Sequence, residues 1–207
     1  MLKNVYYINL EHRTDRKEKV EAELSGLGWE YQRFNAVKHE SGRVGCSTSH
    51  LRLLEMAKEK DLEYIVIVED DIHFTHPEIY KALLNQFFSY NLEYDVLLLA
   101  GNLRLPFIPV ADNVIQIKKS WTTTGYIVRK HYYDTLIENI REGISLLVKN
   151  PSDGRNTIDT YWMRLQARDK WMIIMPRTVT QRADYSDIEE RDTDYSRLML
   201  DNFKIVE

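Results

Sequence analysis

The sequence contains a single cysteine, Cys46, so no disulfide can form within the chain. This excludes the disulfide-rich scaffolds common among small secreted proteins. The residues after Met1 lack the apolar core of a secretory signal peptide, and no apolar run approaches the roughly 20 residues that span a membrane. These absences predict a cytoplasmic protein without a transmembrane segment, although a domain excised from a longer chain would look the same.

The chain also lacks an excess of basic residues. Its 28 Lys and Arg against 32 Asp and Glu give a net charge of −4, which argues against a nucleic-acid partner because such proteins need a basic face. With 207 residues, 43% of them hydrophobic, the chain is long enough to bury a sizeable core. The composition is therefore that of an ordinary globular domain.

An apolar run, Tyr64–Val68, leads directly into three acids, Glu69, Asp70 and Asp71. Such a run is typical of a strand buried on both faces of a parallel α/β sheet, where ligands bind at the carboxyl ends of the strands. Adjacent carboxylates repel one another unless a positive charge lies among them. The pattern indicates a site for Mg²⁺ or Mn²⁺, which prefer oxygen ligands. Alternatively, the acids cap the next helix or face solvent.

Strand and helix patterns alternate along the chain and predict one α/β domain over residues 1–207, with a mostly parallel, Rossmann-like sheet flanked by helices. We expect loops at residues 38–45 and 103–112, the second long enough to form a lid, and a solvated, irregular acidic segment over residues 181–207. The expected strands span residues 5–10, 30–34, 64–68, 94–100, 114–117, 124–128 and 171–175. The expected helices span residues 14–26, 47–60, 77–90, 132–141 and 158–167.

Polar side chains follow the first predicted strand. Asn9, Arg13 and Arg16 lie where a nucleotide enters a doubly wound fold, and arginine offers a planar donor fork suited to a phosphate or a base edge. Two exposed arginines on a helix are the alternative interpretation.

A polar segment, Gly45–His50, leads into the predicted helix over residues 47–60 and forms its first turn. The free N–H groups of a helix start form an anion site, so we expect His50 to donate either to a phosphate or sugar hydroxyl or to the helix terminus itself. Cys46 has no paired histidine and acid in the sequence pattern, and we expect it to pack as a small buried side chain.

Four motifs follow one another along the chain. They are Ile8-Asn9-Leu10-x-x-Arg13-x-Asp15-Arg16, Gly42-x-x-Gly45-Cys46-x-x-Ser49-His50, Glu69-Asp70-Asp71 and Ser186-Asp187-Ile188. Together they resemble glycosyltransferase family 25, which includes bacterial lipooligosaccharide galactosyltransferases of lipopolysaccharide biosynthesis and the collagen hydroxylysine galactosyltransferases. The resemblance implies a nucleotide-sugar-binding domain of the glycosyltransferase-A type, a UDP-sugar donor, Mn²⁺ or Mg²⁺, and transfer with inversion.

The resemblance also implies roles for individual residues. Asp71 would bind the metal, and Glu69 would lie near the ribose or the donor sugar. Many metal-dependent transferases of this fold supply a late histidine to the metal, but the last histidine here is His131, so Asp187 is the expected late ligand. The expected nucleotide- and donor-binding residues are Asn9, Leu10, Arg13, Arg16, Ser49, His50, Glu69, Asp70 and Gly125.

Inversion requires a base that takes the proton of the acceptor hydroxyl. Asp159, near the start of a predicted helix, is the first candidate, although an acid favoured there by the helix dipole is an equal alternative. Asp187 is the second candidate base. The segment Trp121–Tyr126 is expected to line the sugar pocket, with Gly125 allowing close backbone approach, unless its aromatic residues pack in the core.

The sequence therefore predicts a metal-dependent inverting glycosyltransferase. It would move a hexose, galactose or glucose, from a UDP-sugar to a hydroxyl of a glycan or of hydroxylysine in a collagen-like protein. The alternative is a catalytically inactive nucleotide- or sugar-binding module of the same fold. A Mg²⁺-binding phospho-receiver fits less well, because receivers carry their acidic pair after the first strand.

Overall fold

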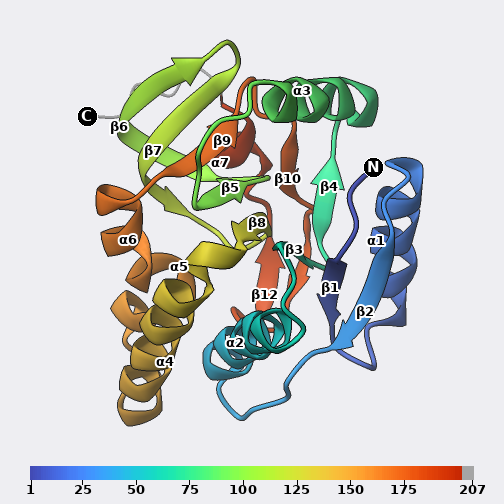
Figure 1. The fold of residues 1–207 in the computed structure, drawn as a ribbon. Helices are drawn as coiled ribbons and strands as arrows, with labels where there is room; N and C mark the ends of the chain where they lie inside the picture. The colour runs from blue at the N-terminus through green and yellow to red at the C-terminus, as the bar shows by residue number, and fades with distance from the viewer. Residues whose placement is uncertain (202–207) are drawn as a thin grey trace.

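The computed structural model describes residues 1–201, and an eight-stranded sheet with helices on both faces forms its centre (Figure 1). The strands follow the order β2-β1-β3-β8-β5-β9-β7-β6. Their bounds are β1 (Val5–Asn9), β2 (Tyr31–Asn35), β3 (Tyr64–Glu69), β5 (Val96–Leu98), β6 (Asn102–Ala111), β7 (Val114–Trp121), β8 (Gly125–Arg129) and β9 (Trp171–Ile174).

Two sets of helices cover the two faces of this sheet. Within residues 1–201, no helix combines the length and the apolar character that crossing a membrane would require. One face carries α1 (Thr14–Gly26), α3 (Pro77–Ser89) and α7 (Ser196–Leu200). The other carries α2 (Gly42–Glu59), α4 (Tyr133–Lys149), α5 (Ile158–Tyr161) and α6 (Met163–Arg168). Short 3-10 helices span Lys130–Tyr132 and Gly154–Asn156.

The alternation of side chains along β3 explains its continuous apolar sequence. Val66 and Val68 pack into the core beneath α1 and α3, whereas Ile65 and Ile67 pack into the core beneath α2 and α4. All four residues are fully buried. The prediction of a central strand buried on both faces is confirmed, and this strand carries the three acids to the edge of the sheet.

The predicted α/β sheet flanked by helices is confirmed, but the strand directions are mixed. β1 runs parallel to β2 and β3, and β5 runs parallel to β9. β8 is antiparallel to both β3 and β5, and β7 is antiparallel to both β6 and β9. Hydrophobic periodicity does not encode strand direction. β7 and β8 therefore run opposite to the strands that they pair with.

The expected loop at residues 103–112 is wrong, because this segment forms most of β6, which pairs with β7 in a hairpin. Pro106 and Pro109 suggested a loop, but β6 is the last strand of the sheet, and an edge strand tolerates residues that cannot donate a ladder hydrogen bond. The pairing shifts register between Arg104 and Phe107, next to the first of these prolines. The segment is therefore part of the sheet and not a lid.

Two helices differ from their expected bounds. α2 begins at Gly42, within the expected loop at residues 38–45, and its first turn is closed by the N–H of Gly45 donating to the carbonyl of Ser41 at 3.0 Å. The helix expected at residues 158–167 is split into α5 and α6 at Trp162, whose side chain is fully buried. Apolar spacing located both segments, and tertiary packing set their ends.

The acidic segment after Gln181 is ordered rather than irregular as far as residue 201, and the rest of the expected segment, residues 202–207, lies outside the described residues. β10 (Val179–Gln181) pairs with β4 (Ile72–Phe74), directly after the three acids. β11 (Asp184–Ser186) and β12 (Arg191–Thr193) then form a hairpin. Arginines of the loop after β1 and of α1 hold this hairpin, as described below, so it is a regular element although most of its residues are exposed, as expected.

Close packing at Gly45 gives a test of the early start of α2. A Cβ there would lie 2.6 Å from the carbonyl oxygen of Val37, whereas a Cβ at Gly26, the last residue of α1, would meet nothing within 4 Å. We expect Gly45→Ala to lower the free energy of unfolding by about 1–3 kcal/mol, as overpacking does. Gly26→Ala should leave it unchanged or slightly raised. Urea unfolding of both variants makes the comparison, and equal stability would contradict this placement of α2.

Candidate functional site

Polar residues after β1 and β3 meet at the carboxyl edge of the sheet, as the sequence predicted. The two strands are parallel neighbours in which Ile8 pairs with Glu69, so Asn9 and Asp70 follow them side by side. Asn9 donates from Nδ2 to Oδ2 of Asp70 at 2.8 Å, and its Oδ1 accepts from Nε of Arg33 at 3.0 Å. Because Asn9 is buried and these bonds use its amide, it positions Asp70.

Arg16 supplies the positive charge among the acids. Its Nη1 lies 3.0 Å from Oδ1 of Asp70 and 3.5 Å from Oδ2 of Asp71. Its Nη2 donates to the carbonyl of Tyr185 at 2.8 Å, and its Nε lies 3.7 Å from Oδ2 of Asp184. The side chain is only 11% exposed. One guanidinium from α1 thus joins the acids after β3 to the β11–β12 hairpin.

A single arginine leaves Asp71 incompletely compensated. Burial, followed by the charges of Glu69 and Asp70, raises the pKa of Asp71 well above its ordinary value. Its Oδ2 accepts a 3.4 Å hydrogen bond from Gln181, but in the part of the chain that the structure describes its buried Oδ1 has no hydrogen-bond partner. An unsatisfied buried carboxylate oxygen beside other acids fits a hard cation, which binds oxygen ligands.

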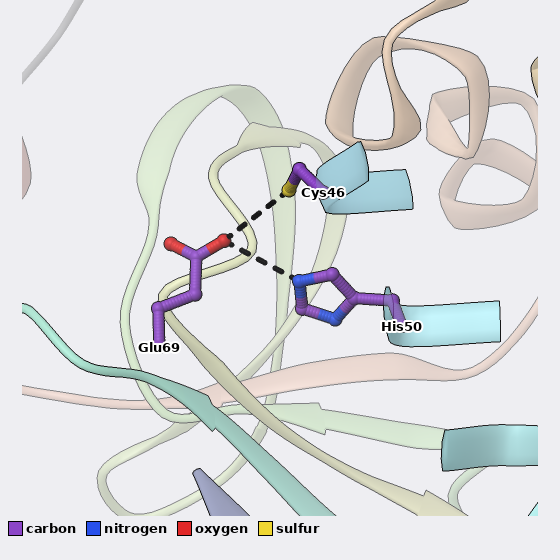
Figure 2. A group of neighbouring side chains, drawn as sticks. All are labelled: Cys46, His50 and Glu69. Carbon is purple, nitrogen blue, oxygen red and sulfur yellow. Dashed lines mark hydrogen bonds and ion pairs between the residues drawn. The ribbon is translucent and has the colours of Figure 1, made fainter. Parts of the chain in front are cut away.

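Glu69 turns away from this network toward α2 and the segment before β8. Its Oε1 accepts from Oγ1 of Thr123 at 2.7 Å and lies 3.4 Å from Nε2 of His50 and 3.8 Å from Sγ of Cys46. Burial opposes ionisation, but the contacts with His50 and Thr123 and the charge of Arg16 hold the pKa of Glu69 below its ordinary value. Figure 2 shows that the second carboxylate oxygen points away from Cys46 and His50.

The anion site expected at Gly45–His50 is wrong, because these residues lie inside α2 rather than at its start. Ser49 is fully buried and donates to the carbonyl of Gly45 while accepting from the N–H of Val37, both at 2.8 Å. His50 is also fully buried, and its Nδ1 lies 2.8 Å from the hydroxyl of Tyr126. Neither residue therefore lies at a helix start where free N–H groups would bind a phosphate.

Gly125 does not leave space for a sugar. A Cβ there would lie 2.8 Å from Cδ1 of Ile72 and 3.1 Å from Cδ1 of Leu99, so core side chains occupy that space. Tyr126 is fully buried and packs edge-on against Trp162. The alternative interpretation, core packing of the aromatic residues, is correct for Tyr126, whereas Trp121 is only partly buried, with the guanidinium carbon of Arg104 5.4 Å from its ring centroid.

Asp187 forms an ion pair with Arg13 in this structure. Its Oδ2 accepts from Nη1 of Arg13 at 2.7 Å, and its Oδ1 lies 3.8 Å from Nε2 of His12. Arg13 also pairs with Asp15 and Asp184, and its N–H donates to the carbonyl of Leu10 at 3.0 Å. The late acid that reaches Arg16 is therefore Asp184, whereas Asp187 pairs with Arg13, and its roles as metal ligand and as base stay predictions.

Asp159 lies in the first turn of α5. Its Oδ2 accepts from the N–H of Thr122 at 3.3 Å. Burial, with a contribution from the charge of Glu69, raises the pKa of Asp159 above its ordinary value. The charge of Glu69 affects the pKa of Asp159, so the two carboxyl groups lie in one region. The role of Asp159 as a base stays a prediction.

The sequence interpretation missed that Cys46 and His50 converge on Glu69. Their spacing of four residues on one helix places both side chains on the same face, and this signal was available in the sequence. Thr123 and Asp184 carried no comparable signal, because β8 and the β11–β12 hairpin bring them to the site from distant parts of the chain.

The unpartnered oxygen of Asp71 generates a stability prediction. The pKa of Asp71 is raised in the folded chain, so its contribution to stability is present at acidic pH and is lost as pH rises through that pKa. In EDTA at neutral pH we expect Asp71→Asn to raise the melting temperature, by roughly 2–4 °C per kcal/mol gained for a chain of this size. The difference in melting temperature between Asp71→Asn and the wild type should become smaller as pH falls. A variant that melts below wild type at neutral pH would contradict this account.

Comparison with known proteins places this geometry in a family. Residues 40–153, more than half of the chain, match the model of glycosyltransferase family 25 (LPS biosynthesis protein). A glycosyltransferase 25 family member from Drosophila melanogaster is 26% identical over 195 residues, which cover 77% of this chain and 30% of that protein. Procollagen galactosyltransferase 1-A from Xenopus laevis is 25% identical over 163 residues, covering 60% of this chain and 26% of that protein.

The chain thus spans less than a third of the curated relatives it matches. Among solved structures, a Drosophila β1,4-galactosyltransferase 7 mutant in complex with manganese, UDP-Gal and xylobiose aligns with a TM-score of 0.50 and 12% identity, covering 94% of this chain and 76% of that one. This likeness concerns the fold, which is that of the glycosyltransferase-A type. From the family model, the relatives and the fold together, the chain belongs to glycosyltransferase family 25.

Proposed function

We propose that this chain carries the donor site of a metal-dependent, inverting glycosyltransferase that uses a UDP-sugar. The observation that carries the proposal is the cluster of buried acids after β3, in which Asp71 has an unpartnered oxygen and Arg16 is the neighbouring positive charge. A divalent cation would pair with the acids, and a diphosphate would pair with the cation and with Arg16.

Asp71 would hold the cation, with Asp70 kept in place by Asn9 and Arg16. When bound, Mn²⁺ or Mg²⁺ supplies the charge that stabilises the departing diphosphate. Arg16 adds a guanidinium fixed by Asp70 and the carbonyl of Tyr185, so its orientation need not change during the reaction. The oxygen of Glu69 that points away from Cys46 and His50 is proposed to accept a hydrogen bond from the ribose or the donor sugar.

Asp159 is the proposed base. In an inverting transfer the acceptor hydroxyl attacks from the face of the sugar opposite the leaving group, and its proton passes to a carboxylate on that face. The raised pKa of Asp159 makes it a better proton acceptor than an ordinary aspartate. The N–H of Thr122 and the side chain of Thr157 hold this carboxylate in place.

The proposed donor is a UDP-hexose, with galactose or glucose as the sugar, and the proposed acceptor is a hydroxyl of a glycan or of hydroxylysine in a collagen-like protein. Family membership and the relatives described as procollagen galactosyltransferases support this choice. The UDP-Gal and manganese held by the structural neighbour are compatible with it. Because the relatives are much longer, other parts of a full-length protein are proposed to complete the acceptor site.

Release of UDP from a UDP-hexose, with an acceptor present, tests the proposal. We expect Asp159→Asn to lower kcat by about 10²–10⁴-fold, the range for loss of a general base, with little change in the Kd for UDP. In the wild type, activity should fall on the acidic side at a pH above the ordinary aspartate range, because the pKa of the base is raised and the base acts only when deprotonated.

Asp134→Asn is the matched control, since Asp134 also lies in the first turn of a helix but its side chain is 68% exposed. It should retain wild-type turnover. Full activity of Asp159→Asn would contradict the assignment of the base. Binding of UDP by the wild type without turnover of UDP-galactose or UDP-glucose would instead favour the inactive binding module.

A further inference from the structure

Cys46, His50 and Glu69 bring a sulfur, a nitrogen and an oxygen to one point (Figure 2). Oε1 of Glu69 lies 3.8 Å from Sγ of Cys46 and 3.4 Å from Nε2 of His50, and the three atoms lie within 4.8 Å of one another. In a tetrahedral zinc site, bonds of about 2.0–2.3 Å place ligand atoms roughly 3.3–3.6 Å apart. Small side-chain movements would therefore bring all three atoms to a shared ion.

The surrounding structure holds these ligands in place. Cys46 and His50 are four residues apart on α2, so both side chains leave the same face of a packed helix. The hydroxyl of Tyr126 lies 2.8 Å from Nδ1 of His50 and fixes the ring with Nε2 directed at Glu69. Such a partner on the second ring nitrogen is typical of metal-binding histidines, where it orients the ligand.

The chemistry of the three atoms selects a different ion from the one proposed at Asp71. Carboxylate oxygens alone suit Mn²⁺ and Mg²⁺, whereas a thiolate and an imidazole suit Zn²⁺ and other thiophilic ions. Burial, followed by the charge of Glu69, raises the pKa of the Cys46 thiol well above its ordinary value, so the thiolate forms here only when a bound cation displaces the proton.

We propose that Cys46, His50 and Glu69 form a binding site for a thiophilic divalent cation, with Zn²⁺ as the natural candidate. Binding forms a bond from the metal to Sγ of Cys46, and the thiol proton leaves to solvent. Three protein ligands leave one tetrahedral position for water. Because Glu69 lies in both this site and the proposed donor site, zinc would draw its carboxylate toward α2, and we expect zinc to inhibit transfer.

Titration of the EDTA-treated wild type with Cd²⁺ or Co²⁺, in a thiol-free reductant and without nucleotide, tests the site. Metal–thiolate bonds give a charge-transfer absorption, and Cys46 is the single cysteine, so the band reports this residue alone. We expect a band that saturates at one ion per chain. Its absence from the folded wild type would overturn the proposal, whatever the variants do.

Variants distinguish metal binding by all three ligands from metal binding by the Cys46 thiol alone. Cys46→Ser should abolish the band, and His50→Gln and Glu69→Gln should each weaken metal binding by at least about tenfold, as losses near a metal centre do. His131→Gln is the control, because His131 is exposed and pairs with Asp95 away from the site. Unchanged affinity in both His50→Gln and Glu69→Gln would show binding to the thiol alone and overturn the proposal. The band needs neither UDP nor turnover, so this result is independent of the proposed transferase activity.

Discussion

The ion pairs of Arg16 with Asp70 and Asp71 join the parts of the chain that make the site. The acids follow a strand that is buried on both faces, so they enter an environment where isolated charges are unfavourable. Arg16 comes from α1, and its other contacts reach Tyr185 and Asp184 on the β11–β12 hairpin. Removing this guanidinium would leave the acids uncompensated and would weaken the attachment of the hairpin, which Arg13 and Lys19 also hold. The local arrangement therefore depends on a charge balance more than on apolar packing.

Glu69 divides this region into two chemically different parts. On one side lie Asp70, Asp71 and Arg16, an environment of oxygen ligands and a guanidinium that suits a hard cation and a diphosphate. On the other lie Cys46 and His50 from α2, with Tyr126 behind the imidazole. Oε1 of Glu69 contacts Cys46 and His50, and the charge of Arg16 on the other side lowers the pKa of the same carboxylate. The proposed inhibition by zinc follows from this shared residue.

Much of the fold followed from residue patterns. The continuous apolar run of β3 and the acids after it predicted both the central strand and its position at a ligand-binding edge. Arg16 was also expected where a ligand enters, but the sequence did not predict its ion pair with Asp70, which the parallel pairing of β1 and β3 allows. The β6 edge strand could not be predicted in this way, because its prolines resemble those of a loop until the position of the strand in the sheet is known.

Other features depended on packing between distant segments. In the sequence, Gly125 is equally compatible with close approach of a ligand and with close packing in the core. The structure shows core packing, because Ile72 and Leu99 occupy the space next to this glycine. Asp184 and Asp187 lie three residues apart in an acidic run, and the hairpin alone determines that the first reaches Arg16 while the second binds Arg13. Charge runs do not reveal which of their members will find a buried partner.

The central claim is that the acids after β3 need a cation to bind the donor nucleotide. Calorimetric titration of UDP into the wild type and Asp71→Ala, each in Mn²⁺ and in EDTA, tests it most directly. The account predicts binding by the wild type in Mn²⁺, and loss of that binding both in EDTA and in Asp71→Ala, with the variant folded by circular dichroism. UDP binding of equal strength with and without Mn²⁺, or in wild type and variant alike, would contradict it, as would no binding at all.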